Sequence, residues 1–194
     1  MLQIAVLISG GGSNLQCLID SMNKSGNIGF SICSVISDRE AAGLQKAEKA
    51  GIKTHLVDRK IGRVKLSSQI NQILKGKADY IVLAGFLSIL EKSFIEDWNR
   101  KIINIHPALL PDFGGKGMYG MHVHEAVINS GAKRSGCTVH FVDSGIDTGE
   151  IINQMSLHIE SGWDADRLQK EVLKLEHILL PETVQMLCGR RENQ

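Results

Sequence analysis

Short apolar runs alternate with amphipathic stretches of helix length through the first hundred residues. The runs are rich in Val, Ile and Leu, as is usual for parallel strands that are buried on both faces. This alternation predicts an α/β fold, with a mostly parallel, twisted sheet between two layers of helices and a Rossmann-like N-terminal half. We expect strands at residues 2–8, 31–36, 54–57, 80–84 and 102–105, and helices at residues 14–21, 41–50, 64–74 and 93–98.

The pattern changes after about residue 118. A helix is expected at residues 119–130, longer strands at 138–142 and 150–159, and a long helix at 164–187. Pro181 lies inside that last helix and should kink or break it, because proline lacks the N–H that the helix needs. With 194 residues and no repeat or linker, the chain is expected to form a single domain over residues 1–194.

Composition excludes several classes of protein. Hydrophobic residues make up 43%, charged residues 22%, and the net charge is +1, which gives no reason to expect nucleic-acid or membrane-surface binding. No apolar run approaches the roughly 20 residues of a bilayer span. The N-terminus reads as a first core strand rather than a signal peptide. The four cysteines are widely scattered, so we expect free thiols in the cytoplasm and neither a disulfide framework nor a zinc site.

Three polar side chains point to acyl-transfer chemistry. Asn104 and His106 have strand spacing among apolar neighbours, so both face one side at the end of a strand that Pro107 terminates. Active sites of parallel α/β sheets lie at that carboxyl end. An amide can stabilise a developing oxyanion, an imidazole can move a proton, and the carboxylate of Asp147 can orient that imidazole. Taken singly, His106 could be structural, and Asp147 could form an Asx turn in its Gly-rich loop.

The segment Ser9-Gly-Gly-Gly-Ser-Asn-Leu15 follows the first strand and opens the first helix. Glycine lets the backbone approach an anion, and the helix N-terminus supplies free amides. A dinucleotide fingerprint is incomplete, because its third glycine would fall at Leu15 and the acidic residue nearest the expected place is Asp38. No Walker loop is present. The loop therefore favours a sugar monophosphate, with a turn that binds no ligand as the alternative.

The other histidines are less informative. His122 and His124 suggest a metal site only weakly, because no third ligand lies near them in the sequence. His140 falls in an expected strand seven residues before Asp147. It either faces the same cleft as Asp147 or is a core residue.

The motifs together resemble the glycinamide ribonucleotide formyltransferases, which are folate-dependent enzymes of purine synthesis. The matching segments occur in the same order along the chain: Ile8-Ser-Gly-Gly-Gly-Ser-Asn-Leu15, Leu83-Ala-Gly-Phe86, Asn104-Ile-His-Pro-Ala-Leu-Leu-Pro111, Gly136-Cys-Thr-Val-His-Phe-Val142 and Ile146-Asp-Thr-Gly149. The resemblance implies the formyltransferase fold. It also implies that 10-formyltetrahydrofolate donates its formyl group to the glycyl amine of 5′-phosphoribosylglycinamide, without a metal.

The resemblance also implies roles for individual residues. Residues 1–100 would form the phosphate-binding half and residues 101–194 the catalytic and folate-binding half. Catalysis would fall to Asn104, His106 and Asp147, with His140 in support. The acceptor's phosphate and ribose would be bound by Gly11, Gly12, Ser13, Asn14 and Glu176. The folate would be bound by Lys65, Leu87, Ser88, Ile89, Leu90, Asn104, Asp143, Ser144, Gly145, Ile146 and Asp147.

The chain departs from this pattern at Ser88, where some members carry an arginine that contacts the folate, and Lys65 falls roughly where another arginine is common. The expected partners are small molecules, and the expected state is a monomer or homodimer. Alternative functions are a formyltetrahydrofolate hydrolase, a formyltransferase for another amine such as methionyl-tRNA, and a non-catalytic folate- or nucleotide-binding module. The two related enzymes carry additional domains, whereas this chain has the length of one fold.

Overall fold

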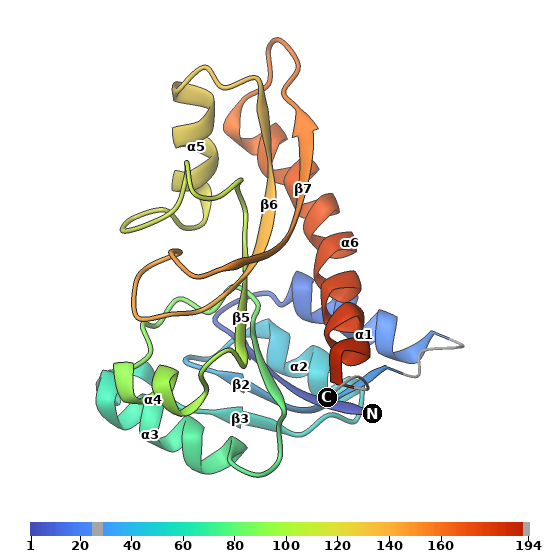
Figure 1. Cartoon of the computed structure of the whole chain (residues 1–194), viewed down its shortest axis with the longest axis vertical. Helices are drawn as coiled ribbons and strands as arrows, with labels where there is room; N and C mark the ends of the chain where they lie inside the picture. The colour runs from blue at the N-terminus through green and yellow to red at the C-terminus, as the bar shows by residue number, and fades with distance from the viewer. Residues whose placement is uncertain (25–28, 192–194) are drawn as a thin grey trace.

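The sheet is the centre of the computed structural model, which describes residues 1–24 and 29–191 (Figure 1). Its strand order is β3-β2-β1-β4-β5-β6-β7, with parallel pairing from β3 to β5 and antiparallel pairing from β5 to β7. The strands are β1 (Leu2–Ile8), β2 (Phe30–Ser37), β3 (Thr54–Leu56), β4 (Tyr80–Leu83), β5 (Ile102–His106), β6 (Arg134–Phe141) and β7 (Ile151–His158). The predicted mostly parallel α/β sheet is confirmed.

Helices cover both faces of this sheet, which confirms the three layers. The helical elements are α1 (Ser13–Asn23), α2 (Ala42–Lys49), the 3-10 turn η1 (Arg59–Ile61), α3 (Arg63–Leu74), α4 (Lys92–Asp97), α5 (Met121–Asn129) and α6 (Ala165–Arg191). The strand β1 explains the layering. Its residues Ile4, Val6 and Ile8 lie in the core beneath α1, α2 and α6, whereas Ala5 and Leu7 lie in the core beneath α3 and α4. Both faces of this central strand are therefore apolar.

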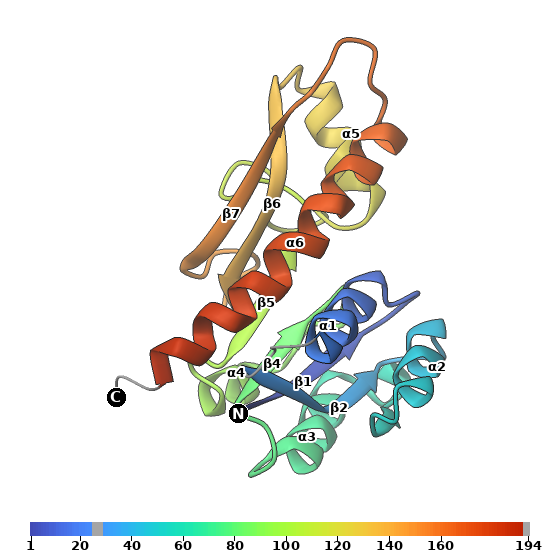
Figure 2. The ribbon, with the colours of Figure 1, turned by 90° about the vertical axis from the view of Figure 1, so that its right-hand side faces the viewer.

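The antiparallel strands β6 and β7 rise beyond the compact lower half of the molecule, with α5 beside them (Figure 1). Helix α6 runs across β6, β7 and α1, and so joins the two halves (Figure 2). Its buried leucines and valines complete the core on that face. The carboxyl end of β5 lies where the parallel sheet becomes antiparallel, and this places Asn104 and His106 next to β6.

Three details of the expected secondary structure are wrong. Helix α5 begins at Met121 rather than at residue 119, because Gly120 has a φ of 56° and ψ of −136°, outside the helical region. Strand β6 begins at Arg134, four residues before the expected start, because pairing with β7 rather than side-chain pattern defines it. Helix α6 is not broken at Pro181 and continues to Arg191, since Leu179, Leu180 and Val184 around it are buried and their packing outweighs the missing hydrogen bond. The expected break is therefore wrong, and a kink at Pro181 stays a prediction.

No helix in the described residues is both long enough and apolar enough to cross a membrane.

Candidate active site

Asn104 and His140 face each other across the β5–β6 ladder, where they form a registered pair. The amide nitrogen of Asn104 lies 3.1 Å from Nε2 of His140, and Nδ1 of His140 lies 2.9 Å from the carbonyl oxygen of Phe141. Burial lowers the pKa of His140, so its ring is neutral near pH 7. A carbonyl can only accept, so Nδ1 carries the proton and Nε2 accepts from Asn104. One N–H of the Asn104 amide remains for a ligand.

His106 is held at one ring nitrogen by the backbone. Its Nε2 lies 2.7 Å from the carbonyl oxygen of Phe113, which is an acceptor, so Nε2 carries a hydrogen. The other nitrogen, Nδ1, lies 3.6 Å from Oδ2 of Asp147. The side chain of His106 is 4% exposed. Nδ1 is therefore the atom through which His106 can take up or donate a proton.

Asp147 lies between the two imidazoles. Its Oδ1 is 3.7 Å from Nε2 of His140, and its Oδ2 accepts a hydrogen bond of 3.1 Å from the amide of Gly115. Its φ of 57° is in the left-handed region, which Asp tolerates better than most residues do. This conformation projects the carboxylate from the β6–β7 loop toward the end of β5. The structure thus brings together the four side chains predicted for catalysis.

A cavity of about 920 Å³ opens beside these residues. Ser13, Asn14 and Glu176 form one part of its wall. The predicted folate residues Leu87, Ser88, Ile89, Leu90, Asp143, Ser144, Gly145 and Ile146 also line it, as do Asn104, His106, His140 and Asp147. Gly11 and Gly12 are not on its wall but directly precede Ser13. Residues from both halves of the chain form the wall, so the predicted division of labour at residue 100 stays a prediction.

Lys65 is placed differently from the expectation. It is exposed on α3 and is not part of the cavity wall, whereas Arg63, the first residue of that helix, lines the cavity. The side chain of Arg63 is directed by an ion pair of 2.6 Å to Glu91. The position of Lys65 thus argues against a folate contact, and Arg63 takes its place as the candidate cation.

Asn14 and Glu176 form a buried polar pair on the cavity wall. The amide nitrogen of Asn14 donates to Oε2 of Glu176 at 2.6 Å, and Oδ1 of Asn14 is buried without a hydrogen-bond partner. Burial raises the pKa of Glu176 to about 7, although the hydrogen bond from Asn14 opposes this shift. A buried acceptor without a partner is costly, so a ligand with hydroxyl groups would fit here.

The raised pKa of Glu176 predicts a dependence of stability on pH. Between the unfolded value of 4.5 and the folded value of about 7, the folded chain holds a proton that the unfolded chain has lost. The contribution of Glu176 is therefore full below pH 4.5 and is lost as the pH rises through 7, a change of roughly 3 kcal/mol. We expect Glu176→Gln to lose less stability than the parent between pH 5 and 8, measured by urea unfolding.

The control for that experiment is Glu182→Gln, an exposed carboxylate on the same helix. It should show the parent's pH dependence. Equal pH dependence in Glu176→Gln and the parent would contradict the buried, protonated carboxyl.

The glycine loop ends at the N-terminus of α1. Gly12 has a φ of 67°, and its carbonyl accepts the first bond of the helix, from the amide of Gln16 at 3.0 Å. The amides of the first turn therefore have no acceptor within the helix and are free to bind an anion. The loop rests on α2, where Gly43 donates to the carbonyl of Gly10 at 3.1 Å and Lys46 to that of Gly12 at 3.4 Å.

A family description, Formyl transferase, matches residues 2–184. The chain belongs to the formyl transferase family. Solved structures agree: glycinamide ribonucleotide transformylase 1 of Symbiobacterium toebii has a TM-score of 0.91 at 33% identity, covering 98% of this chain and 89% of that one. The phosphoribosylglycinamide formyltransferase of Brucella melitensis has a TM-score of 0.87 at 38% identity, covering 96% and 95%.

Similar curated proteins are longer. The human trifunctional purine biosynthetic protein adenosine-3 is 42% identical over 191 residues, 96% of this chain and 18% of that protein. The chloroplastic phosphoribosylglycinamide formyltransferase of Vigna unguiculata is 40% identical over 192 residues, 97% of this chain and 62% of that protein. The chain thus spans less than two thirds of these relatives.

Ser88, where the resemblance leads to an arginine in some members, lines the cavity and is bonded to a buried carboxylate. The Ser88 hydroxyl donates to Oδ2 of Asp38 at 2.5 Å, and Nε of Arg39 donates to Oδ1 of the same carboxylate at 3.3 Å. Asp38 is fully buried, and both its oxygens are engaged. Asp38 is therefore not available to hold a ribose, which argues further against a dinucleotide. Arg39 lines the cavity near Ser88.

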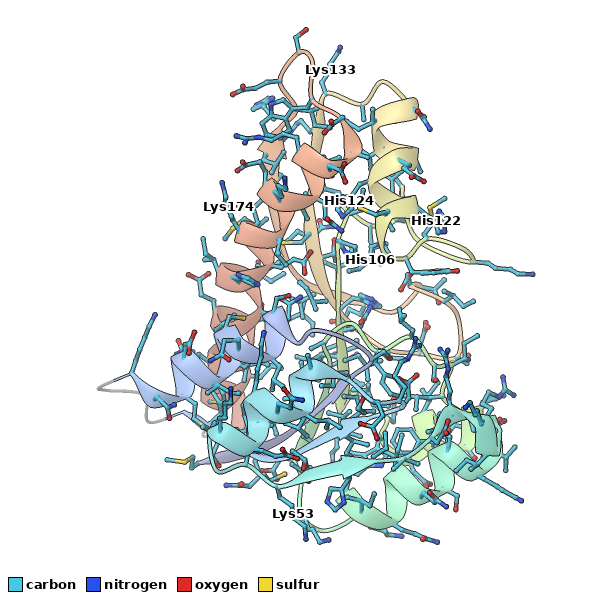
Figure 3. The ribbon with its side chains drawn as sticks, turned by 180° about the vertical axis from the view of Figure 1, so that it is seen from behind. Lys53, His106, His122, His124, Lys133 and Lys174 are labelled. Carbon is cyan, nitrogen blue, oxygen red and sulfur yellow. The ribbon has the colours of Figure 1, made fainter. Side chains whose placement is uncertain are left out.

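His122 and His124 point in different directions from α5 (Figure 3). His122 is exposed, 3.4 Å from Glu125, and its ring lies edge-on to that of Tyr119. His124 is buried on the cavity wall near His106, and burial together with the charge of His106 lowers its pKa to about 4. Among the described residues, no group of three or more His, Cys, Asp or Glu side chains is arranged to hold a metal ion. The two histidines therefore do not act as a pair.

Several parts of this formyl transferase site carry no side-chain signal in the sequence. Phe113 and Gly115 act through a backbone carbonyl and a backbone amide, which every residue possesses. Gly43 supports the glycine loop by having no side chain: a Cβ there would lie 2.4 Å from Cδ1 of Ile8 and 3.0 Å from the carbonyl oxygen of Gly10. The sequence does place a glycine early in the second helix. Its contact with the glycine loop could not be predicted, because that contact depends on how the helix packs against the loop.

Replacing Gly43 tests the support of the loop. We expect Gly43→Ala to move the Gly10–Gly12 backbone and to destabilise the protein by about 1–3 kcal/mol, the usual cost of an overpacked site. Phosphate-bearing ligands should bind more weakly in calorimetry. The matched control is Gly189→Ala, also a helical glycine, where a Cβ meets nothing within 4 Å. Unchanged stability and ligand affinity in Gly43→Ala would show that the loop does not need this close approach.

Proposed function

We propose that this protein transfers the formyl group of 10-formyltetrahydrofolate to the glycyl amine of 5′-phosphoribosylglycinamide, releasing tetrahydrofolate. The observation that carries the proposal is a shared cavity. The first turn of α1, the Asn14–Glu176 pair and the Asn104–His106–Asp147 trio all border it. An anionic, hydroxyl-bearing acceptor and the reacting groups would thus meet in one place. The names of the similar solved structures support this acceptor.

The acceptor would lie with its phosphate at the N-terminus of α1. The free amides of the first turn and the hydroxyl of Ser13 suit a phosphate. The ribose hydroxyls would donate to Oδ1 of Asn14, which lacks a partner, and to the carboxyl of Glu176. This orientation directs the glycyl amine away from α1, toward the end of β5.

The donor would occupy the wall formed by residues 87–90 and 143–147. Leu87, Ile89 and Ile146 are 50%, 61% and 45% exposed, which is high for large apolar side chains. An aromatic pterin and benzoyl group would cover them and gain from the burial. Arg39 and Arg63 on the same cavity wall suit the carboxylates of the folate tail.

The chemistry follows from the geometry of the trio. The neutral amine attacks the formyl carbon, and the formyl oxygen becomes negative in the tetrahedral intermediate. The free N–H of Asn104 and a protonated Nδ1 of His106 would donate to that oxygen. The bond to the folate nitrogen then breaks, and the amine's proton passes to that nitrogen. The Asp147 carboxylate stabilises the positive charge that develops on the imidazole and on the attacking amine.

The test is a comparison of acceptors with purified protein and 10-formyltetrahydrofolate. We expect tetrahydrofolate to form only with phosphoribosylglycinamide, with one formylated acceptor per tetrahydrofolate, measured by absorbance and mass spectrometry. Equal release of tetrahydrofolate in water alone would identify a hydrolase instead. Formylation of charged methionyl-tRNA would identify a formyltransferase for another amine. Binding of folate without turnover would identify a non-catalytic folate-binding protein.

The remaining features of the proposal concern the setting of the enzyme. The cytoplasm, a monomeric or homodimeric state, the absence of a bound metal and the absence of nucleic-acid binding stay predictions. Light scattering after gel filtration would measure the oligomeric state.

A further inference from the structure

The turn that follows His106 is tied to β6 and β7 by a group of hydrogen bonds on Thr138 and Gln154. The hydroxyl of Thr138 donates to the carbonyl of Ala108 at 2.7 Å and accepts from the amide of Leu110 at 3.1 Å. The side-chain nitrogen of Gln154 donates to the Thr138 hydroxyl at 2.9 Å and to the carbonyl of Leu110 at 3.0 Å. Neither side chain lines the cavity.

These bonds use the full capacity of both groups. A hydroxyl has one hydrogen and two lone pairs, and all three are engaged at Thr138. The amide nitrogen of Gln154 has two hydrogens, and both are engaged. The backbone groups that they bind have no alternative partner, since Ala108 is 0% and Leu110 6% exposed. The turn is therefore fixed in one position relative to β6 and β7.

The fixed turn leads directly to the atoms that orient the trio. The amide of Gly114 donates to the carbonyl of Pro111 at 3.4 Å, so residues 111–114 form a tight turn. Within that turn, the carbonyl of Phe113 reaches Nε2 of His106 at 2.7 Å. The next amide, that of Gly115, donates to Asp147. The position of Leu110 thus determines where both backbone partners of the trio lie.

We propose that Thr138 and Gln154 are positioning residues for His106. By holding the 108–111 turn, they keep the Phe113 carbonyl on Nε2, so that the neutral ring is protonated at Nε2. Its free nitrogen Nδ1 then faces the cavity and Asp147, where it can take up the proton that it donates in the proposed transfer. This inference rests on the proposed function only where it says that Nδ1 serves the formyl transfer. The protonation of the ring is a property of the protein alone.

The experiment combines kinetics with NMR of the His106 ring, labelled with 15N, at a pH where the ring is neutral. Thr138→Val keeps the shape and removes the hydroxyl. Thr138→Ser restores the hydroxyl. Gln154→Met keeps the length of an exposed side chain and removes the two N–H donors. Because it changes a different residue of the same group, it still tests the inference if Thr138→Val does not fold. The matched control is Ser156→Ala, an exposed residue of β7 whose hydroxyl accepts from Arg134.

We expect the parent, Thr138→Ser and Ser156→Ala to show Nε2 protonated. Gln154→Met and Thr138→Val should show a mixture of the two tautomers, with kcat lower by on the order of 10- to 100-fold and KM for both substrates nearly unchanged. Retention of the Nε2–H form in Gln154→Met and in folded Thr138→Val would overturn the inference, whatever their activity. If the parent transfers no formyl group, the NMR result still decides the inference, and only the proposed function fails.

Discussion

Replacing His106 with alanine should lower turnover by about 10²- to 10⁴-fold, the usual range for a positioned acid–base group. The imidazole is buried, is held at Nε2 by the Phe113 carbonyl, and presents only Nδ1 to the cavity. Alanine removes that nitrogen, and neither Asn104 nor His140 can replace it. Stopped-flow measurement of tetrahydrofolate release gives the turnover, and calorimetry gives the affinities of both ligands, which should change little.

The control for this prediction is His122→Ala. His122 is exposed on α5 and does not line the cavity. It should keep the parent's turnover. A turnover in His106→Ala within a few-fold of the parent would refute the role of the imidazole.

Asp147→Asn should also lower turnover by about 10²- to 10⁴-fold. The substitution suits the backbone, because Asn tolerates the positive φ at this position, and its side-chain oxygen can still accept from Gly115. What it removes is the negative charge 3.6 Å from Nδ1 of His106. Without that charge, the imidazolium that faces the developing oxyanion is no longer stabilised. Single-turnover kinetics would isolate the chemical step from product release.

Asp97→Asn is the matched control, since Asp97 is an exposed carboxylate on α4. Its turnover should equal that of the parent, and both variants should keep the parent's thermal unfolding midpoint. Near-normal turnover in Asp147→Asn would show that the charge of Asp147 has no role in catalysis. Asp147 would then be a turn residue whose side chain only accepts the hydrogen bond from Gly115.

The fold could be predicted from the sequence where side-chain pattern decides it. Val- and Ile-rich runs such as that of β1 become buried strands because no other element removes so much apolar surface from water. The prediction was wrong where backbone conformation or tertiary contact decides. Gly120 delays the start of α5, strand pairing extends β6 back to Arg134, and packing carries α6 through Pro181.

The same distinction applies to the candidate site. Asn104, His106 and Asp147 are recognisable because their side chains suit the chemistry, whereas the residues alone left His140 as a cleft or a core residue. The structure brings all four side chains together. The cation predicted for the folate, Lys65, does not line the cavity, whereas Arg63 does. Lys65 and Arg63 are two positions apart on α3, which separates them by about 200° around the helix axis. A resemblance in sequence could not fix that register, because a cation on either side of the helix gives the same local pattern.

The four side chains at the reacting centre all come from residues 104–147, whereas α1 and Glu176 of α6 come from the two ends of the chain. Two separate parts of the chain therefore form the proposed acceptor pocket, and a third part between them forms the proposed reacting centre. We expect substitutions in the first turn of α1 or along the cavity side of α6 to change which amine is accepted and to leave the reacting groups in place. In a family with this arrangement, acceptor specificity can change while the residues that carry out the transfer stay the same.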